Sequence, residues 1–319
     1  MKILGLVSAV AVAGLLATPA TAADLTLKFG HVGAPGSLFE ASANEFARCA
    51  NATLGDKAEV QVFGSSQLGN DTELLQKLKL GQVNFALPSS VMSSVAEVFG
   101  VFEMPYIIKS RDHMRKVQAA IMDSKLQPAV EAKGYRIIGL WENGFRNITN
   151  SVRPINTPED VAGLKLRTPP ELQIVAAVEG LGASATQIAF PELPNALNQG
   201  VVDGQENPVG VIYHFKLDDF QDHLALTRHV YNSMVHVINK DSWDRLTPEQ
   251  QAIVREESEK AGAAMRELVE AQEEEELAKL EARGMQITRP DLAPFREMVG
   301  ASEAMQRVTD YTGKDNMDT

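Results

Sequence analysis

The sequence has 319 residues, of which 42 are Asp or Glu and 30 are Lys or Arg, so its formal net charge at pH 7 is −12. A chain this acidic is a poor partner for nucleic acid or for an anionic membrane surface. Its single cysteine, Cys49, excludes an intramolecular disulfide and thiolate metal clusters. Cys49 lies in a segment with helical apolar periodicity, where we expect a buried and unreactive thiol.

The first 22 residues have the pattern of a secretory signal peptide. Lys2 precedes the apolar run ILGLVSAVAVAGLLA, and the segment ends in Ala20-Thr21-Ala22, a small-residue cleavage site. No later segment reaches the 18 apolar residues of a membrane span. We therefore expect an exported, periplasmic protein. Its mature chain of 297 residues has a net charge of −13, because the removed segment holds one Lys and no acid.

From Leu25 onward, segments typical of strands and of helices alternate. The hydrophobic patterns predict strands at 25–32, 58–64, 83–89 and 135–141, with helices at 37–55 and 70–82. The series then restarts with a helix opening at Thr157, a strand at 164–167, a helix from Glu171, a helix at 191–200, a strand at 201–207 and a helix at 209–220. This alternation indicates mostly parallel sheet covered by helices, arranged as two α/β lobes.

The longest predicted helix runs from about 248 to 283 without an internal proline. Thr247 is a candidate N-cap with Pro248 at the first helical position and Gln250 three residues beyond the cap, and Gly284 suits the other end. About 36 residues at ~1.5 Å each give roughly 54 Å, which exceeds the width of one lobe. The helix must therefore lie across both lobes or project into solvent.

Polar side chains follow the ends of two predicted strands. LKLR ends in Arg167 before two prolines, and VVDGQEN ends in Asn207 before Pro208. Ligands of open α/β sheets bind beyond the carboxyl ends of the strands. An arginine at such a position can hold a carboxylate through two parallel hydrogen bonds. Arg146 is a further candidate for a polar contact with the ligand, and Phe190 is a candidate for an apolar wall of the site.

Each of these residues also has a purely structural interpretation. Arg167 fits a surface position at a domain edge, and Arg146 fits an ion pair within the fold. Asn207 fits a turn or a helix cap, and Phe190 fits ordinary core. Taken together in an exported two-lobed protein, the four residues favour a cleft that binds a carboxylate.

Several longer motifs resemble one known family. GFRNITNS (144–151), GLKLRTPP (163–170) and QGVVDGQENP (199–208) are similar to segments of the solute receptors of tripartite ATP-independent periplasmic (TRAP) transporters, the dicarboxylate-receptor-like family. QLGNDTELLQKLKLGQVNFAL (67–87) resembles the signature of the first lobe in that family, and the likeness covers essentially the whole mature chain.

The resemblance implies a two-lobed periplasmic binding protein fold with a long helix spanning both lobes and a ligand cleft between them. It implies lobe I at 24–144 plus 233–270, and lobe II at 145–232 plus 271–319. It implies that Arg167 is the principal carboxylate anchor, that Asn207 and Arg146 assist it, and that Phe190 lines the site. It further implies delivery of the ligand to membrane subunits driven by an ion gradient.

The sequence departs from the sialic-acid receptors of the family after the third strand, where an acidic residue is expected. The segment NFALPSSVMSS carries no charge, so an ammonium or a second carboxylate on the ligand would be badly paired there. We therefore expect a small monocarboxylate with a hydroxylated or aromatic body, such as a sugar acid or an aromatic acid. His31, Ser89 and Ser90 are the expected contacts from the first lobe.

Other functions are considered as alternatives. The chain lacks G-x-S-x-G, S-x-x-K and H-E-x-x-H motifs, and its six histidines are scattered, so the sequence predicts no enzyme, no metal site and no cofactor. A receptor for an ATP-driven importer or for a sensor is a second alternative, and the long connecting helix argues against the usual ATP-driven type. We expect a monomer.

Overall fold

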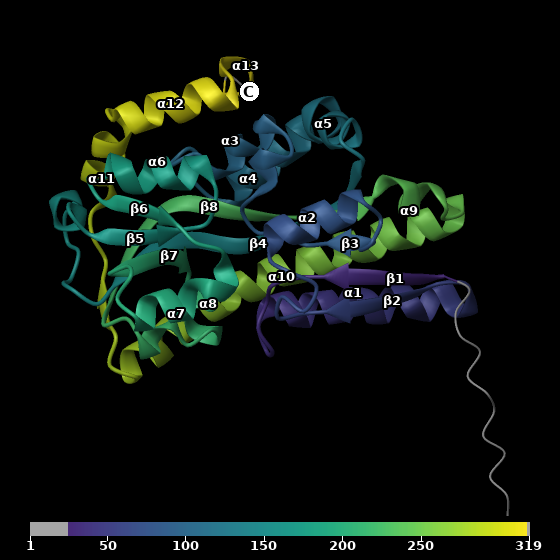
Figure 1. The fold of residues 1–319 in the computed structure, drawn as a ribbon, viewed down its shortest axis with the longest axis horizontal. Helices are drawn as coiled ribbons and strands as arrows, with labels where there is room; N and C mark the ends of the chain where they lie inside the picture. Colours follow the sequence, from purple (N-terminus) through teal and green to yellow (C-terminus); the bar gives the residue numbers. More distant parts are fainter. Residues whose placement is uncertain (1–24, 318–319) are drawn as a thin grey trace, which may run out of the picture.

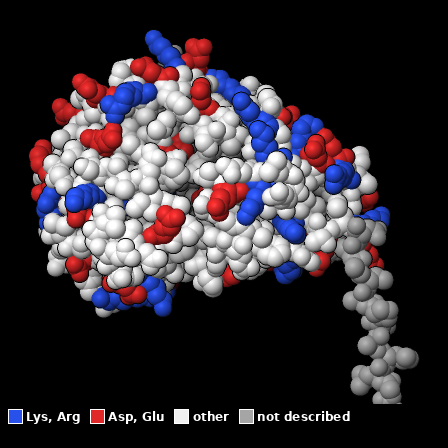
Figure 2. Space-filling model, in the orientation of Figure 1, with Lys and Arg blue, Asp and Glu red and all other residues white. Residues whose placement is uncertain are grey.

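The structure is a computed structural model of the chain and describes residues 25–317. The predicted signal peptide lies outside the described residues. Among those that are described, no helix is both long enough and apolar enough to cross a membrane. The acidic and basic side chains are interspersed on the face shown in Figure 2.

The described chain alternates strands and helices (Figure 1). The strands are β1 (Thr26–Gly30), β2 (Glu59–Phe63), β3 (Phe85–Ala86), β4 (Tyr135–Asn150), β5 (Lys165–Thr168), β6 (Ser184–Gln187), β7 (Gly204–Pro208), β8 (His223–Asn239) and β9 (Gln286–Thr288). The helices are α1 (Leu38–Leu54), α2 (Asp71–Lys79), α3 (Gly100–Glu103), α4 (Arg111–Ile121), α5 (Gln127–Glu131), α6 (Leu172–Gly180), α7 (Leu193–Asn198), α8 (Val209–His214), α9 (Lys240–Asp244), α10 (Pro248–Ala282), α11 (Leu292–Gly300), α12 (Glu303–Thr312) and α13 (Lys314–Met317).

The strands form one continuous sheet in the order β2-β1-β3-β8-β4-β7-β5-β6, with β9 paired to β8. The pairs β1–β2 and β1–β3 are parallel in one half, and β5–β6 and β5–β7 are parallel in the other. The long strands β4 and β8 are antiparallel to each other and run from one half into the other. The two predicted lobes are thus joined by two crossing strands.

The register of the crossing strands is irregular near the middle of β4. Shifts occur between Ile137 and Gly139, between Glu142 and Gly144, and between Arg146 and Ile148. Gly144 adopts a φ of +115°, and a Cβ placed on it would lie 3.3 Å from side-chain atoms of both Pro208 and Val269. A glycine is therefore required where β4 passes from one half to the other. The predicted lobe boundary at 144/145 coincides with this point and stays a prediction.

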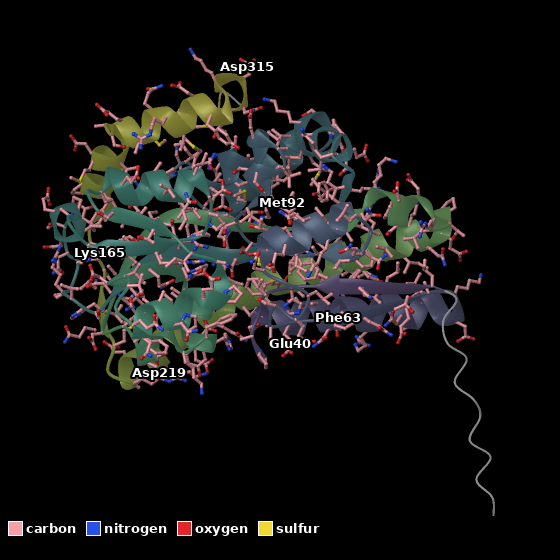
Figure 3. The ribbon with its side chains drawn as sticks, viewed as in Figure 1. Glu40, Phe63, Met92, Lys165, Asp219 and Asp315 are labelled. Carbon is pink, nitrogen blue, oxygen red and sulfur yellow. The ribbon has the colours of Figure 1, made fainter. Side chains whose placement is uncertain are left out.

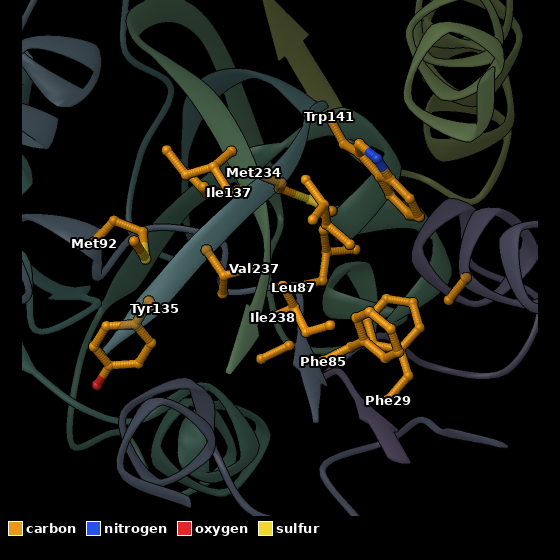
Figure 4. Close-up of a cluster of buried hydrophobic side chains, with 14 of the residues drawn as sticks. Phe29, Phe85, Leu87, Met92, Tyr135, Ile137, Trp141, Met234, Val237 and Ile238 are labelled. Carbon is orange, nitrogen blue, oxygen red and sulfur yellow. The ribbon is translucent and has the colours of Figure 1, made fainter. Parts of the chain in front are cut away.

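Aromatic rings fill the core of the half that contains β1 (Figure 4). Phe29 and His236 stack with their ring centroids 4.6 Å apart, and Trp141 lies edge-on to His236 at 4.9 Å. Burial lowers the pKa of His236 to about 3, so the imidazole is neutral and packs as an aromatic ring. Histidine in this position is part of the core.

The long helix α10 lies across both halves, as the sequence predicts. It packs against α1 and β4 on one side of the molecule and against α8 on the other. Its 35 residues begin with the expected capping box, in which Thr247 Oγ1 accepts from Gln250 N and Gln250 Oε1 accepts from Thr247 N. The helix touches β4 closely at Gly262, where an added Cβ would lie 2.5 Å from Trp141 Cδ1.

Some elements differ from the sequence prediction. The helix expected to open at Thr157 is only a short 3-10 turn, Pro158–Val161, and the strand β8 and the helices α4, α11 and α12 were not predicted. The two prolines after Arg167 precede the N-cap residue of α6, Glu171, rather than lying inside the helix. Cys49 is half-buried on α1 instead of buried.

The close contact at Gly262 generates a prediction. Gly262→Val would force a branched side chain against Trp141 and the backbone of Leu140, so it should destabilise the protein by about 1–3 kcal/mol. Ala264→Val, on the exposed face of the same helix turn, is the matched control for helix propensity. Thermal unfolding followed by circular dichroism measures both, and equal melting temperatures would show that this contact does not constrain α10.

Candidate ligand-binding site

A pocket of about 370 Å³ lies between the two halves. Side chains from both halves line it: Asn70, Asp71, Thr72, Ser89, Ser90, Val91, Arg146, Arg167, Pro169, Pro170, Ala189, Phe190 and Asn207. In Figure 3, Lys165, the first residue of β5, lies at the outer side of one half, whereas Phe63 lies in the other half. The carboxyl end of β5 thus points inward, towards the pocket.

The guanidinium of Arg167 is buried in the pocket wall with no carboxylate partner among the described residues. The residue is 1% exposed, its Nε donates to Ile188 O at 2.8 Å, and its Cζ lies 5.7 Å from the ring centroid of Phe190. Neither Nη1 nor Nη2 donates a hydrogen bond to the described part of the chain. Burial lowers the pKa of Arg167 to about 9, because removing the charged guanidinium from water costs free energy that no neighbouring carboxylate fully offsets.

Neighbouring strands hold the predicted residues close together. Arg167 on β5 is in register with Gln205 on β7, and Asn207 on β7 is in register with Asn147 on β4. The amide of Asn207 donates to Gln205 Oε1, and Gln205 Nε2 in turn donates to Thr149 Oγ1 at 2.9 Å. The sheet therefore brings Arg167, Asn207 and Phe190 to one wall, as the sequence predicts.

Arg146 forms the ion pair that the sequence analysis gives as its structural alternative, and it also lines the pocket. Its Nε and Nη2 donate to the two carboxylate oxygens of Glu206, Nη2 also donates to Glu206 O at 2.8 Å, and Nη1 donates to Asn232 Oδ1 at 3.0 Å. These bonds use four of its five N–H groups. Burial opposes both charges, yet their pairing raises the pKa of Arg146 and lowers that of Glu206.

The pairing of Arg146 with Glu206 agrees with the structural alternative for this residue, and its assisting role toward a ligand stays a prediction. Its charge is already neutralised, so it forms a structural ion pair that leaves at most one N–H group for a ligand. The sequence contains Glu206 in the motif QENP, but nothing in a single sequence shows which arginine it pairs with.

The first half contributes a carboxyl group that was not foreseen. Asp71, the first residue of α2, is buried, and its Oδ2 accepts from Ser89 Oγ at 3.0 Å while its Oδ1 has no partner among the described residues. Burial raises the pKa of Asp71 to about 6, and the charge of Arg167 partly offsets that effect. The segment after β3 is uncharged as stated, but the wall that faces Arg167 carries an acid from α2.

The other first-lobe predictions have separate outcomes. Ser89 and Ser90 line the pocket, Ser89 as the partner of Asp71. His31 is not in the pocket lining; it is fully buried behind β1, where its Nδ1 accepts from Gly33 N at 3.1 Å. Burial lowers the pKa of His31 to about 4, so its ring is neutral and packs against Phe29. His31 therefore lies outside the pocket that holds the other predicted residues.

Two more buried carboxyl groups lie beside the pocket. Glu171 accepts from Ser93 Oγ, and burial raises its pKa to about 8. Glu103 accepts from Asn232 Nδ2 at 2.9 Å, and burial together with the nearby Glu171 raises its pKa well above the ordinary range. Burial thus favours the neutral form of both groups, and the charged side chains of the pocket lining are Arg146, which is paired with Glu206, Arg167 and, in part, Asp71.

This arrangement defines a class of protein. Two halves joined by crossing strands enclose a pocket, and one wall of it presents a buried guanidinium with two free nitrogen atoms. A ligand carboxylate at this wall would neutralise the charge through bidentate hydrogen bonds. The fold and the site are those of a two-lobed solute-binding protein.

Comparison with known proteins gives the family. The chain belongs to the bacterial extracellular solute-binding proteins, family 7, whose model matches residues 29–307. It is 33% identical over 318 residues to the C4-dicarboxylate-binding periplasmic protein DctP of Rhodobacter capsulatus, covering 94% of this chain and 95% of that protein. The resemblance to TRAP receptors, which are periplasmic proteins that bind small acids and work with membrane subunits, is thereby confirmed.

Solved structures agree with the fold. A TRAP receptor from Polaromonas sp. JS666, bound to D-erythronate, superposes with a TM-score of 0.87 at 31% identity, covering 92% of this chain and 97% of that one. The sugar acid binding protein DctPAm of Advenella mimigardefordensis, in complex with galactonate, also gives a TM-score of 0.87, at 29% identity over 92% of this chain and 95% of that one. The predicted two-lobed fold with its long helix is confirmed.

The ion pair of Arg146 with Glu206 generates a stability prediction. Arg146→Ala leaves the Glu206 carboxylate buried without its partner, and the free energy of unfolding should fall by about 3–5 kcal/mol. Arg48→Ala, which breaks an exposed pair with Glu45, is the control and should leave the melting temperature nearly unchanged. Denaturant titration measures the first effect, and a loss no larger than that of the control would contradict a structural role for the pair.

Asp71 generates a prediction about pH. Its raised pKa means that the folded state holds the proton of Asp71 more tightly than the unfolded chain does. The contribution of this proton to the free energy of unfolding is therefore fully present below about pH 4 and is lost as the pH rises through 6. Asp71→Asn, which cannot ionise, should therefore gain up to about 3 kcal/mol relative to the wild type above pH 7 and nothing at pH 3.5. Exposed Asp56→Asn is the control. A difference that does not depend on pH would refute the raised pKa.

Proposed function

We propose that the protein is a periplasmic receptor for a small hydroxylated monocarboxylate, of the sugar-acid class, which it delivers to the membrane subunits of an ion-gradient-driven TRAP transporter. The role is binding and release, without a chemical step on the ligand. Arg167 anchors the carboxylate, Asn207 and Phe190 form the same wall, and Asp71, Ser89 and Ser90 face it from the other half.

One observation carries the proposal: Arg167 is buried with no carboxylate partner in the described part of the chain. A buried charge without a counter-ion is costly, and the fold retains it beside a pocket instead of pairing it as it pairs Arg146. A ligand carboxylate removes that cost on binding. Relief of this cost at Arg167 therefore contributes part of the binding free energy of an anion.

Asp71 supports the hydroxylated ligand over the aromatic one. Its free Oδ1 accepts a hydrogen bond from a ligand hydroxyl, whereas an aromatic ring leaves that oxygen unpaired. An acid in the opposite wall also repels a second carboxylate. A ligand ammonium group, by contrast, is no longer disfavoured, because Asp71 supplies the acid that the segment after β3 lacks.

Binding couples to closure because the pocket wall comes from both halves. A ligand that contacts Arg167 on β5 and Asp71 on α2 stabilises the closed arrangement over an open one, in which only one set of contacts remains. Closure excludes water and strengthens the arginine–carboxylate pair. The crossing strands β4 and β8, with Gly144 between the halves, supply the connection around which they move.

A second candidate is a receptor for C4-dicarboxylates. It is favoured by the 33% identity to the C4-dicarboxylate-binding protein of Rhodobacter capsulatus. The charges of the pocket argue against it, since Arg167 is the one guanidinium in the lining that is not paired with an acid among the described residues, and Asp71 faces it.

Calorimetric titration against a panel of acids tests the proposal. D-Erythronate, D-galactonate and D-glucuronate represent hydroxylated monocarboxylates, succinate the dicarboxylates and benzoate the aromatic acids. We expect at least one of the first three to bind at least tenfold more tightly than succinate and benzoate. Arg167→Lys should weaken that ligand by about 2 kcal/mol, because a lysine cannot form the bidentate pair.

Arg307→Lys, at an exposed position on α12, is the matched control and should bind as the wild type does. Tight binding of succinate with none of the hydroxylated acids would replace the proposal by the second candidate. A loss smaller than twofold in Arg167→Lys would remove Arg167 as the anchor.

A further inference from the structure

A groove of about 980 Å³, open to solvent, lies away from the ligand pocket and shares no lining residue with it. It is formed by α4 with the π-helical turn Met122–Leu126 that follows, the start of α5, the first part of β4, and residues 255–266 of α10. The lining residues are Arg115, Gln118, Met122, Asp123, Gln127, Arg136, Ile137, Ile138, Gly139, Leu140, Arg255, Glu259 and Arg266.

The floor of the groove is the edge of a strand. Residues 136–140 of β4 line it consecutively, and because side chains alternate between the faces of a sheet, consecutive lining residues indicate the backbone edge rather than a face. This part of β4 pairs with β8 on one side only, and in the described chain β7 joins β4 only from Arg146 onward.

Side chains cap the backbone at this edge on both sides of one residue that the ladder leaves unpaired. The register shift between Ile137 and Gly139 gives β4 one residue more than β8, so the backbone of Ile138 is left outside the ladder. On either side of it, side chains take the place of a strand: Ile137 N donates to Gln127 Oε1 at 3.3 Å, and Arg266 Nη1 donates to Leu140 O at 2.7 Å.

The walls of the groove are basic, although the chain as a whole is acidic. Four arginines line it against two acids, Asp123 and Glu259, in a chain of net charge −12. Arg255 and Arg136 both stack on Trp243, with their guanidinium carbons 5.4 Å and 4.8 Å from the centroid of its ring. Stacking on an aromatic ring holds a guanidinium while leaving its N–H groups free for an anion.

The four arginines differ in how far they are already paired. Arg115 pairs with the exposed Asp112 and Arg136 pairs with the half-exposed Glu131, and both pairs are open to water and weak. Arg255 is exposed and has no ion pair to the described residues. Positive charge is thus available along the groove to a partner that carries carboxylates.

We propose that this groove binds an extended acidic segment of a partner protein, which adds a strand to the edge of β4 in place of the Gln127 and Arg266 side chains and places its carboxylates against Arg115, Arg136 and Arg255. The edge recognises polypeptide backbone and the walls recognise negative charge, so the two features select the same chemistry. The proposal does not depend on which acid binds in the ligand pocket.

A labelled peptide tests the proposal directly. The probe is the blocked peptide acetyl-Glu-Val-Asp-Thr-Glu-Val-Asp-amide carrying a fluorophore, and its binding to the full-length mature protein is followed by fluorescence anisotropy at low ionic strength. We expect saturable binding that weakens with added salt, together with changes in the backbone amide NMR signals of residues 137–140. The double variant Arg115→Glu/Arg255→Glu should bind at least tenfold more weakly.

Three controls separate the parts of the proposal. Arg307→Glu, at an exposed position outside the groove, should bind the peptide as the wild type does. A peptide with Gln and Asn in place of its acids tests the charge, and a peptide N-methylated at alternate residues tests the strand pairing; both should bind at least fivefold more weakly. The variants should keep the wild-type melting temperature and affinity for the acid found in calorimetry, which separates this outcome from that of the ligand pocket.

Some results would overturn the proposal. These are no binding of the acidic peptide at millimolar concentration, equal binding by the double variant, or equal binding of the N-methylated peptide. Binding of the peptide with amide shifts only outside residues 137–140 would overturn it as well.

Discussion

The structure depends on a buried positive charge that the protein itself does not neutralise. Burial of Arg167 costs free energy, and its lowered pKa is the sign of that cost. The fold compensates by tying Nε to the carbonyl of Ile188 and by placing the Phe190 ring alongside, which orients the guanidinium but leaves both Nη atoms for a ligand. Selectivity for a carboxylate follows from this unpaired state.

The surrounding groups keep that charge unpaired. Glu206 forms its ion pair with Arg146, and burial raises the pKa of Glu103 and Glu171, which favours their neutral forms, so none of these three acids forms an ion pair with Arg167. The crossing strands hold the ion pair in the middle of the sheet while the two walls of the pocket come from opposite halves. The unpaired charge of Arg167 thus lies among acids that are paired or whose charged forms are disfavoured by burial.

Much of this arrangement is encoded locally. Alternating strand and helix patterns, the capped 35-residue helix and the placement of Arg167 and Asn207 at strand ends follow from periodicity, capping and proline positions. The role of Arg146 and the presence of Asp71 in the pocket do not, because each depends on which residues meet across the fold. Strand β8 escaped prediction because its 17 residues are buried on both faces, polar ones included, and so show no simple alternation. His31 follows a strand end as Arg167 and Asn207 do, yet it is fully buried and does not line the pocket.

The most direct test of Arg167 as the carboxylate anchor is a crystal structure of the protein with the acid that binds it most tightly. We expect the two carboxylate oxygens of the ligand to lie within hydrogen-bond distance of Nη1 and Nη2 of Arg167, with a hydroxyl group of the ligand facing Asp71. A ligand whose carboxylate lies on Arg146 alone, with Arg167 turned away or bound to a protein carboxylate, would contradict it.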